Sequence, residues 1–320
     1  MSVKNRFKNF EWLVDDAGVT ITKFLKKGAT SVDIPNKIGG KPVVAIGAAA
    51  FYGCSSLRKV SFPSRLRTIG FRAFSGCFSL TEVSFPSRLQ TIGDDAFSGC
   101  FSLLEVSLPE GLQTIGDDAF SGCSSLTEVS LPAGLQTLGD RAFYGCKSLL
   151  NFGVAKGNAN FRSVDGVLFS ADGKKLLKYP CGRQKTEYVV PDGVVEIAKS
   201  AFYKCESLKE VSLPEGLQTI DSWAFFGCSS LRKVSFPSGL QTIGFRAFFG
   251  CSSLTEVSFP SGLQTIGEEA FCDCKSLGNV SLPCVKIGKN AFGRSLPAPG
   301  DPFYWAERGG VYADWGNPFF

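Results

Sequence analysis

Apolar and polar positions along this chain recur with a fixed 23-residue period. Cysteines mark the period, since Cys54, Cys77 and Cys100 are evenly spaced, and an Ala-Phe pair recurs with them. The apolar positions of one copy are Leu80, Val83, Phe85, Leu89, Ile92, Ala96, Phe97 and Cys100. Self-similarity at a fixed spacing of this length is the signature of a stacked repeat architecture.

Each copy contains the pattern of one short β-strand. Val83 and Phe85 alternate around Ser84, which is strand spacing, and the segment is too short for an amphipathic helix. Pro86 ends the strand because proline has no N–H to donate to a ladder. Copies of equal length place these strands side by side and parallel, about 4.8 Å apart. The pattern therefore predicts a solenoid with a parallel sheet on one side and irregular or 3-10 turns on the other.

The second half of the copy is predicted to return along the opposite side of the stack. We expect the eight apolar positions of each copy to point inward, with the small Ala96 where space is short and Phe97 filling the interior. Gly93 is expected either to adopt a conformation that a side chain forbids or to permit close approach of two backbones.

The period is interrupted by a central insertion. Cys146 and Cys205 are 59 residues apart, which is two periods plus 13 residues. The repeats therefore resume in the same pattern after an inserted segment. Two apolar runs joined by Asp172-Gly173 predict a β-hairpin there. The expected organisation is a single continuous solenoid with an N-terminal cap (1–31), leucine-rich repeats (32–150), an inserted hairpin unit (151–189), further repeats (190–293) and an aromatic tail or cap (294–320).

Composition narrows the function classes. The net charge is +5 without a basic cluster, so nucleic-acid binding is not expected. Histidine is absent, which removes the commonest general base. No run of about 18 apolar residues predicts a transmembrane helix. The segment from Met1 to Val14 lacks an apolar signal-peptide core, which predicts a cytoplasmic protein if this is the full-length chain.

The twelve cysteines are interpreted mainly as core residues. Nine occupy one repeat position, where parallel Cβ vectors disfavour disulfides, so buried free thiols are expected. Cys181 stands alone in the insertion. Cys272, Cys274 and Cys284 form an irregular group, but it lacks zinc-site spacing and a histidine. No metal or cofactor site is assigned.

Paired acids are the candidates for catalytic groups. Asp94-Asp95, Asp117-Asp118 and Glu268-Glu269 share a repeat position that elsewhere holds Phe71-Arg72, which is typical of a solvated face. In the insertion, Asp165, Asp172 and Lys174 are interpreted as turn residues, although this segment leaves room for an active site. No catalytic residue is assigned, and the chain is predicted not to be an enzyme.

The repeat Leu80-x-x-Val83-x-Phe85-Pro86, followed by Leu89-x-x-Ile92-Gly93-x-x-Ala96-Phe97-x-x-Cys100, resembles the BspA-like leucine-rich repeat of treponemal type. The segment from Phe161 to Phe169 is similar to an element found within such arrays. The resemblance implies a β-rich leucine-rich-repeat solenoid of the α/β type with a concave parallel sheet. It also implies a bacterial or protozoan surface or secreted protein linked to adhesion, host-protein binding and aggregation.

Two non-enzymatic functions follow from these expectations. The first is a binding module for proteins or glycans, including host extracellular matrix or cell surfaces, that uses the outward residues of its strands. The second is a self-associating scaffold, a homo-oligomer without a dedicated ligand. The candidate binding residues are Arg58, Lys59, Glu82, Glu105, Glu128, Asn151, Lys209, Glu210, Arg232, Lys233, Glu256 and Asn279.

Overall fold

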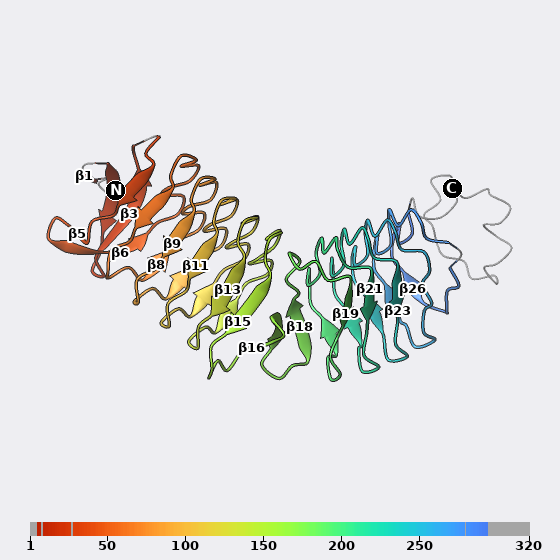
Figure 1. Ribbon diagram of the computed structural model, residues 1–320. Helices are drawn as coiled ribbons and strands as arrows, with labels where there is room; N and C mark the ends of the chain where they lie inside the picture. Colours follow the sequence, from red (N-terminus) through yellow and green to blue (C-terminus); the bar gives the residue numbers. More distant parts are fainter. Residues whose placement is uncertain (1–4, 8, 27, 279, 294–320) are drawn as a thin grey trace. The chain divides into compact units, whose positions relative to one another are not determined.

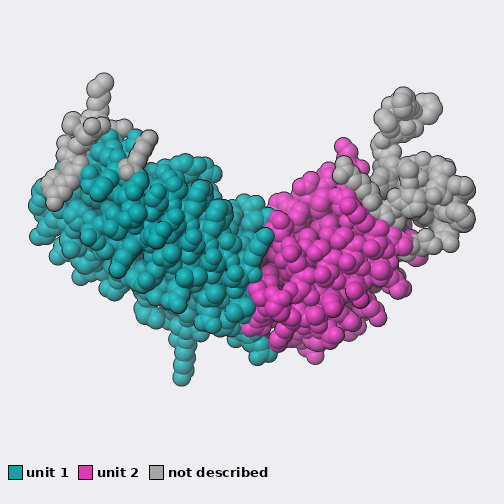
Figure 2. Space-filling model, turned by 45° about the horizontal axis from the view of Figure 1, so that its top comes forward, with its two compact units in different colours: residues 1–166 teal, residues 167–320 magenta. Residues whose placement is uncertain are grey.

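The computed structural model describes residues 5–7, 9–26, 28–278 and 280–293. It divides into two compact units, residues 1–166 and 167–320, shown in teal and magenta in Figure 2. Strands and turns build both units, and none of the described residues forms a helix (Figure 1). The solenoid of short parallel strands predicted from the repeats is confirmed. The aromatic tail predicted at 294–320 lies outside the described residues.

Most regular repeats contribute two strands, where the sequence predicted one. The first, here called the Val strand, contains the central valine of the repeat. In unit 1 the Val strands are β4 (Ser31–Asp33), β7 (Lys59–Ser61), β9 (Glu82–Ser84), β11 (Glu105–Ser107), β13 (Glu128–Leu131) and β15 (Asn151–Val154). They pair in parallel as β4-β7-β9-β11 and β13-β15.

The second strand, here called the Thr-Ile strand, follows the proline turn. In unit 1 these strands are β8 (Thr68–Ile69), β10 (Thr91–Ile92), β12 (Thr114–Ile115) and β14 (Thr137–Leu138), which pair in parallel. β6 (Lys41–Ile46) precedes them in the same sheet. Such short strands suffice because the matching strands of neighbouring repeats supply their hydrogen bonds, a pairing that a pattern within one repeat does not reveal.

An antiparallel three-stranded meander, made of two consecutive hairpins, begins unit 1. It consists of β1 (Asn5–Phe7), β2 (Phe10–Val14) and β3 (Val19–Phe24), and β3 pairs in parallel with β6. β5 (Lys37–Ile38) forms an antiparallel pair with β6. The ring of Phe24 stacks on Phe51 with centroids 5.0 Å apart, so the meander covers the first core phenylalanine of the stack.

Unit 2 repeats this arrangement. The predicted hairpin is formed by β17 (Val167–Ser170) and β18 (Lys175–Lys178), which pair antiparallel around Asp172-Gly173. β18 then leads the parallel Thr-Ile strands β20 (Glu196–Ile197), β22 (Thr219–Ile220), β24 (Thr242–Ile243), β25 (Thr265–Ile266) and β26 (Lys286–Ile287). The Val strands are β19 (Glu187–Val189), β21 (Glu210–Ser212) and β23 (Lys233–Ser235). Unit 1 ends with β16 (Phe161–Val164).

The core consists of ladders of like residues. Phe74, Phe97 and Phe120 are fully buried and stack with ring centroids 5.2 and 5.3 Å apart. Seven of the eight inward positions predicted for one copy are buried, but Phe85 is only half-buried. Its ring meets Phe97 edge to face at 5.5 Å. Phe85 directly precedes a proline at the corner of the repeat, where its ring reaches the core from the side.

The structure decides between the two roles predicted for Gly93. Gly93 does not have a positive φ; a Cβ there would lie 3.0 Å from the carbonyl carbon of Gly70 in the preceding repeat. Close backbone approach is therefore the correct alternative. The left-handed conformation occurs instead at Asp95 (φ 54°) and at Gly99 (φ 73°). The described residues include no helix long and apolar enough to span a membrane.

Candidate functional site

The predicted binding residues of unit 1 form a column on the Val strands. The structure places Lys59 opposite Glu82 and Glu82 opposite Glu105, and Glu128 lies opposite Asn151. The three glutamates are exposed because they alternate with buried valines along each strand. Among the residues that the structure describes, none of the three carboxylates forms an ion pair. Like charges at directly opposed positions destabilise a sheet, so Glu82 and Glu105 repel each other.

The corresponding column of unit 2 has a different charge pattern. Glu187, Glu210, Lys233 and Glu256 follow one another in register, so a cation lies between two of the carboxylates. Opposite charges on neighbouring strands support the sheet. Each unit therefore has one pair of directly opposed glutamates, Glu82–Glu105 in unit 1 and Glu187–Glu210 in unit 2, and in unit 2 a lysine follows that pair.

The remaining predicted residues fall into three groups. Arg58, Lys209 and Arg232 are exposed and directly precede the Val strands. Asn151 is half-buried and lies opposite Glu128. Asn279 lies outside the described residues.

Two apolar neighbours of the column, Leu104 and Leu150, expose 51% and 45% of their surface, which adds apolar area to the acidic face of unit 1.

The repeated cysteines act as buried hydrogen-bond donors. The Cys100 thiol donates to the carbonyl oxygen of Phe74 in the preceding repeat, at 3.3 Å. Burial raises the pKa of Cys100 and Cys228 to about 12. Thiols with such pKa values are not nucleophiles at neutral pH, so this ladder is structural.

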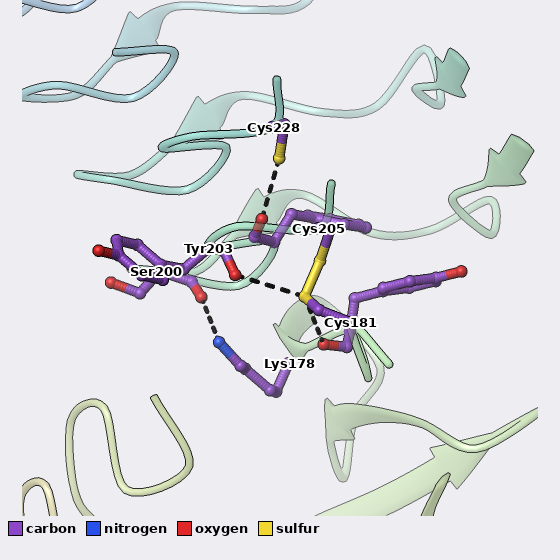
Figure 3. Close-up of a disulfide and its surroundings, with 8 residues drawn as sticks. Lys178, Cys181, Ser200, Tyr203, Cys205 and Cys228 are labelled. Atoms are coloured by element: carbon purple, nitrogen blue, oxygen red, sulfur yellow. Dashed lines mark hydrogen bonds between the residues drawn. A yellow bond between two sulfur atoms is a disulfide. The ribbon is translucent and has the colours of Figure 1, made fainter. Parts of the chain in front are cut away.

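The expectation of free thiols is wrong at the first repeat of unit 2. Cys205 forms a disulfide with Cys181, with Cα atoms 4.6 Å apart (Figure 3). Cys181 is 24 residues from Cys205, one more than the period, because the hairpin unit is out of phase with the repeats. Cys181 therefore does not occupy the repeat position of the other nine cysteines, and the objection based on parallel Cβ vectors does not extend to it.

Main-chain oxygens surround the disulfide. The Cys181 sulfur lies 3.4 Å from the carbonyl oxygen of Tyr179 and 3.5 Å from that of Tyr203 (Figure 3). Nearby, Lys178 Nζ donates a hydrogen bond to the Ser200 carbonyl at 2.7 Å. The bridge thus joins the end of the hairpin unit to the first regular repeat of unit 2.

The paired acids have a structural use beyond a solvated face. Asp94 Oδ1 accepts a hydrogen bond from the backbone N–H of Asp117 at 2.9 Å, and Asp117 does the same for Asp140 at 2.7 Å. The second acid of each pair forms an ion pair, Asp95 with Arg72 and Asp118 with Arg141. These contacts link successive repeats and do not set two carboxylates across a cleft.

The irregular cysteines do not come together as one site. Cys274 is fully buried in the ladder and Cys272 is buried, whereas Cys284 is exposed. Among the described residues, no group of three or more histidine, cysteine, aspartate or glutamate side chains could hold a metal ion.

Sequence reasoning missed the surface aromatic residues of the turns. In unit 2, Tyr203, Phe226 and Phe249 stack with ring centroids 5.1 and 5.0 Å apart, and all three are half-buried. In unit 1, Phe78 and Phe101 form an exposed stack at 5.1 Å. The sequence contains a signal for these stacks. In successive repeats an aromatic residue directly follows the Ala-Phe pair or the cysteine, where other repeats have serine.

Comparison with known proteins identifies the repeat. The model of the BspA type leucine rich repeat region matches in six copies, over residues 24–170 and 179–297. No curated protein matches the chain.

Solved structures share its fold. A leucine rich cell surface protein from Faecalibacterium prausnitzii has 24% identity and a TM-score of 0.65, with 93% of this chain and 99% of that chain covered. The pneumococcal vaccine antigen PcpA has 24% identity and a TM-score of 0.75, with 93% and 92% covered. The leucine rich repeat protein of T. pallidum has 32% identity and a TM-score of 0.50, with 72% and 91% covered.

Proposed function

This chain belongs to the BspA-type leucine-rich repeat family, and on that basis we propose that it is a non-enzymatic protein-binding module that acts at a cell surface. The cell-surface assignment is supported by the F. prausnitzii protein of the same fold, which is a cell surface protein. The binding assignment is supported by the sheet surface of unit 1.

The carboxylate column Glu82, Glu105 and Glu128 is the observation that carries the proposal. Register brings the first two directly opposite each other, and all three are exposed. A partner that places cations at the strand spacing of about 4.8 Å would relieve their mutual repulsion. The exposed side chains of Leu104 and Leu150 beside the column would supply apolar contact area to the same partner.

The partner class that fits this surface is a basic protein segment. Arg58 and Lys59 at one end of the column would repel the same segment, which fixes where it ends. Electrostatic complementarity of this kind raises association rates and selects partners. Host extracellular-matrix proteins and cell-surface glycoproteins are the proposed sources of the segment.

Charge reversal tests the proposal. The triple variant Glu82→Lys, Glu105→Lys, Glu128→Lys is compared with the native chain for binding to immobilised matrix proteins and to whole cells. The control reverses Glu110, Asp192 and Glu215, exposed acids of the turns that follow the Val strands, and so makes the same change in net charge. Loss of binding in the first variant alone supports the proposal; binding that is equal in both variants and the native chain rejects this surface.

A further inference from the structure

Some turn positions of the repeat hold aromatic or basic residues in three successive repeats of unit 2 and serine or aspartate in two successive repeats of unit 1. Tyr203, Phe226 and Phe249 of unit 2 lie two residues before the repeat cysteine, a position that holds Ser98 and Ser121 in the middle repeats of unit 1 and tyrosine in its first and last. Phe245 and Lys199 occupy the position that holds Asp94 and Asp117 in unit 1. The corresponding members are called here the aromatic strip (Lys199, Tyr203, Lys204, Trp223, Phe226, Phe245, Arg246, Phe249) and the acidic strip (Asp94, Asp95, Asp117, Asp118).

The stacked rings of the aromatic strip have a common orientation. Its three stacked rings are nearly parallel, with interplanar angles of 12° and 4°, so their faces are directed at one another and their edges outward. Ring edges carry the positive part of the aromatic quadrupole. Edge-directed rings favour carboxylates and offer little face area for a sugar ring.

Cations occupy ring faces along the same strip. Lys199 Nζ lies 5.3 Å from the Trp223 ring, and Lys204 Nζ lies 5.7 Å from the Tyr203 ring. Arg246 Cζ lies 4.9 Å from the centroid of the Phe245 ring and 5.3 Å from that of the Phe249 ring. Arg246 also forms an ion pair with Glu269. These contacts hold the cationic side chains over the aromatic residues, so the surface combines apolar area with positive charge.

The acidic strip of unit 1 has the matching properties. Arg72 and Arg141 pair with Asp95 and Asp118, so the negative charge of the strip is concentrated on Asp94 and Asp117. Each of those two carboxylates is held by a backbone N–H one repeat further on, which orients it without neutralising its charge. Ser98 and Ser121 are smaller than the aromatic residues at the same repeat position of unit 2.

Both strips also have the same pitch. Surface rings in unit 2 are 5.0 to 5.1 Å apart, and those of Phe78 and Phe101 in unit 1 are 5.1 Å apart. When two surfaces have the same repeat distance, each repeat of one can contact one repeat of the other along several repeats. An acidic protein without such repeats lacks this match. We propose that the aromatic strip of one chain binds the acidic strip of a second copy of the same chain.

The contact is heterologous, since the two sides use different residues. It does not depend on the sheet surface assigned under the proposed function, because it uses the turn side of the repeats. An experiment that rejects the binding surface on the Val strands therefore does not reject the contact between copies, and the reverse also holds.

Sedimentation velocity at increasing concentration of the full chain provides the test. The first variant is Phe226→Ser with Phe249→Ser, which installs the residue that the middle repeats of unit 1 have at this position. The second is Asp94→Lys with Asp117→Lys, which installs the residue found at Lys199. Both changes copy repeats already present in the chain, and circular dichroism checks that each variant is folded. Each variant alone is expected to associate on the order of 30-fold more weakly than the native chain.

Mixing the two variants is the decisive arm. One retains an intact acidic strip and the other an intact aromatic strip, so the mixture is expected to form a 1:1 complex while each variant alone stays monomeric. Raising the salt concentration from 50 to 500 mM is expected to weaken that complex by screening. A native chain that remains monomeric, association unchanged in the variants, or a mixture that does not associate would each overturn the proposal. Binding of polyglutamate to the aromatic strip without self-association would assign the strip to another acidic partner and overturn it equally.

Discussion

The thiol of Cys100 donates a hydrogen bond to the carbonyl oxygen of Phe74, the core aromatic residue of the preceding repeat, at 3.3 Å. The same relation, 26 residues apart, joins Cys77 to Phe51, Cys123 to Phe97, Cys146 to Phe120, Cys228 to Phe202, Cys251 to Phe225 and Cys274 to Phe248. Each cysteine thus fills space and satisfies a main-chain oxygen of its neighbour, which explains its recurrence better than packing alone.

The thiol ladder predicts loss of stability in alkaline solution. Burial raises the pKa of Cys100 from its ordinary value of 9.0 to about 12 in the folded chain. Between these two pH values the unfolded chain releases the thiol proton and the folded chain retains it, so the free energy of unfolding falls as pH rises. We expect a slope of about 1.4 kcal/mol per pH unit for each such thiol.

Urea unfolding at pH 8, 9 and 10 measures this slope. Because lysine and tyrosine also titrate in alkali, the native chain is compared with Cys100→Ala, which removes one thiol. A smaller pH dependence in the variant supports the assignment, whereas identical slopes would mean that the thiol does not titrate differently in the two states.

The stacked core phenylalanines predict a sharp difference between two ring deletions. Phe97 is fully buried between Phe74 and Phe120, so Phe97→Ala is expected to lower the free energy of unfolding by about 3–5 kcal/mol. Phe101 is 49% exposed, and Phe101→Ala should cost less than about 1 kcal/mol. Chemical denaturation of both variants makes the comparison, and similar losses would contradict the inward assignment of Phe97.

The disulfide predicts a redox-dependent stability of unit 2. Its loop spans 24 residues, for which cross-linking is expected to contribute about 3 kcal/mol. A thiol reductant should therefore lower the midpoint of thermal unfolding in the native chain. In Cys181→Ala the midpoint should already be lower and should not respond to reductant. Peptide mapping without reductant checks the pairing, and a Cys181 peptide recovered unlinked would disprove it.

Two glycines predict opposite responses to alanine. A Cβ at Gly139 would lie within van der Waals overlap of the Gly116 and Asp117 backbones, so Gly139→Ala is expected to cost about 1–3 kcal/mol. At Gly216 nothing lies within 4 Å and φ is not positive, so Gly216→Ala should be neutral or stabilise by up to about 1 kcal/mol. Unfolding free energies of the pair test whether close approach of repeats is limiting at Gly139.

The candidate surface was predictable only in part. Strand alternation alone exposes Glu82, Glu105 and Glu128, so their place on the sheet surface follows from the sequence. The alternating charges of Glu210 and Lys233 also follow from the repeat register. The same register places Tyr203 and Phe226 one repeat apart, but their half-burial depends on the conformation of the turns, which the register does not give.

The sequence by itself determined the 23-residue period, the Val strand, the hairpin around Asp172-Gly173 and most of the inward positions. In a solenoid each repeat contacts its neighbours at equivalent positions, so the spacing of apolar residues specifies the stack. Tertiary structure decided the Thr-Ile strands, the half-burial of Phe85 and the Cys181–Cys205 bridge. These depend on which atoms of two repeats meet, and at Cys181 on a one-residue phase shift whose spatial effect emerges only when the chain is folded.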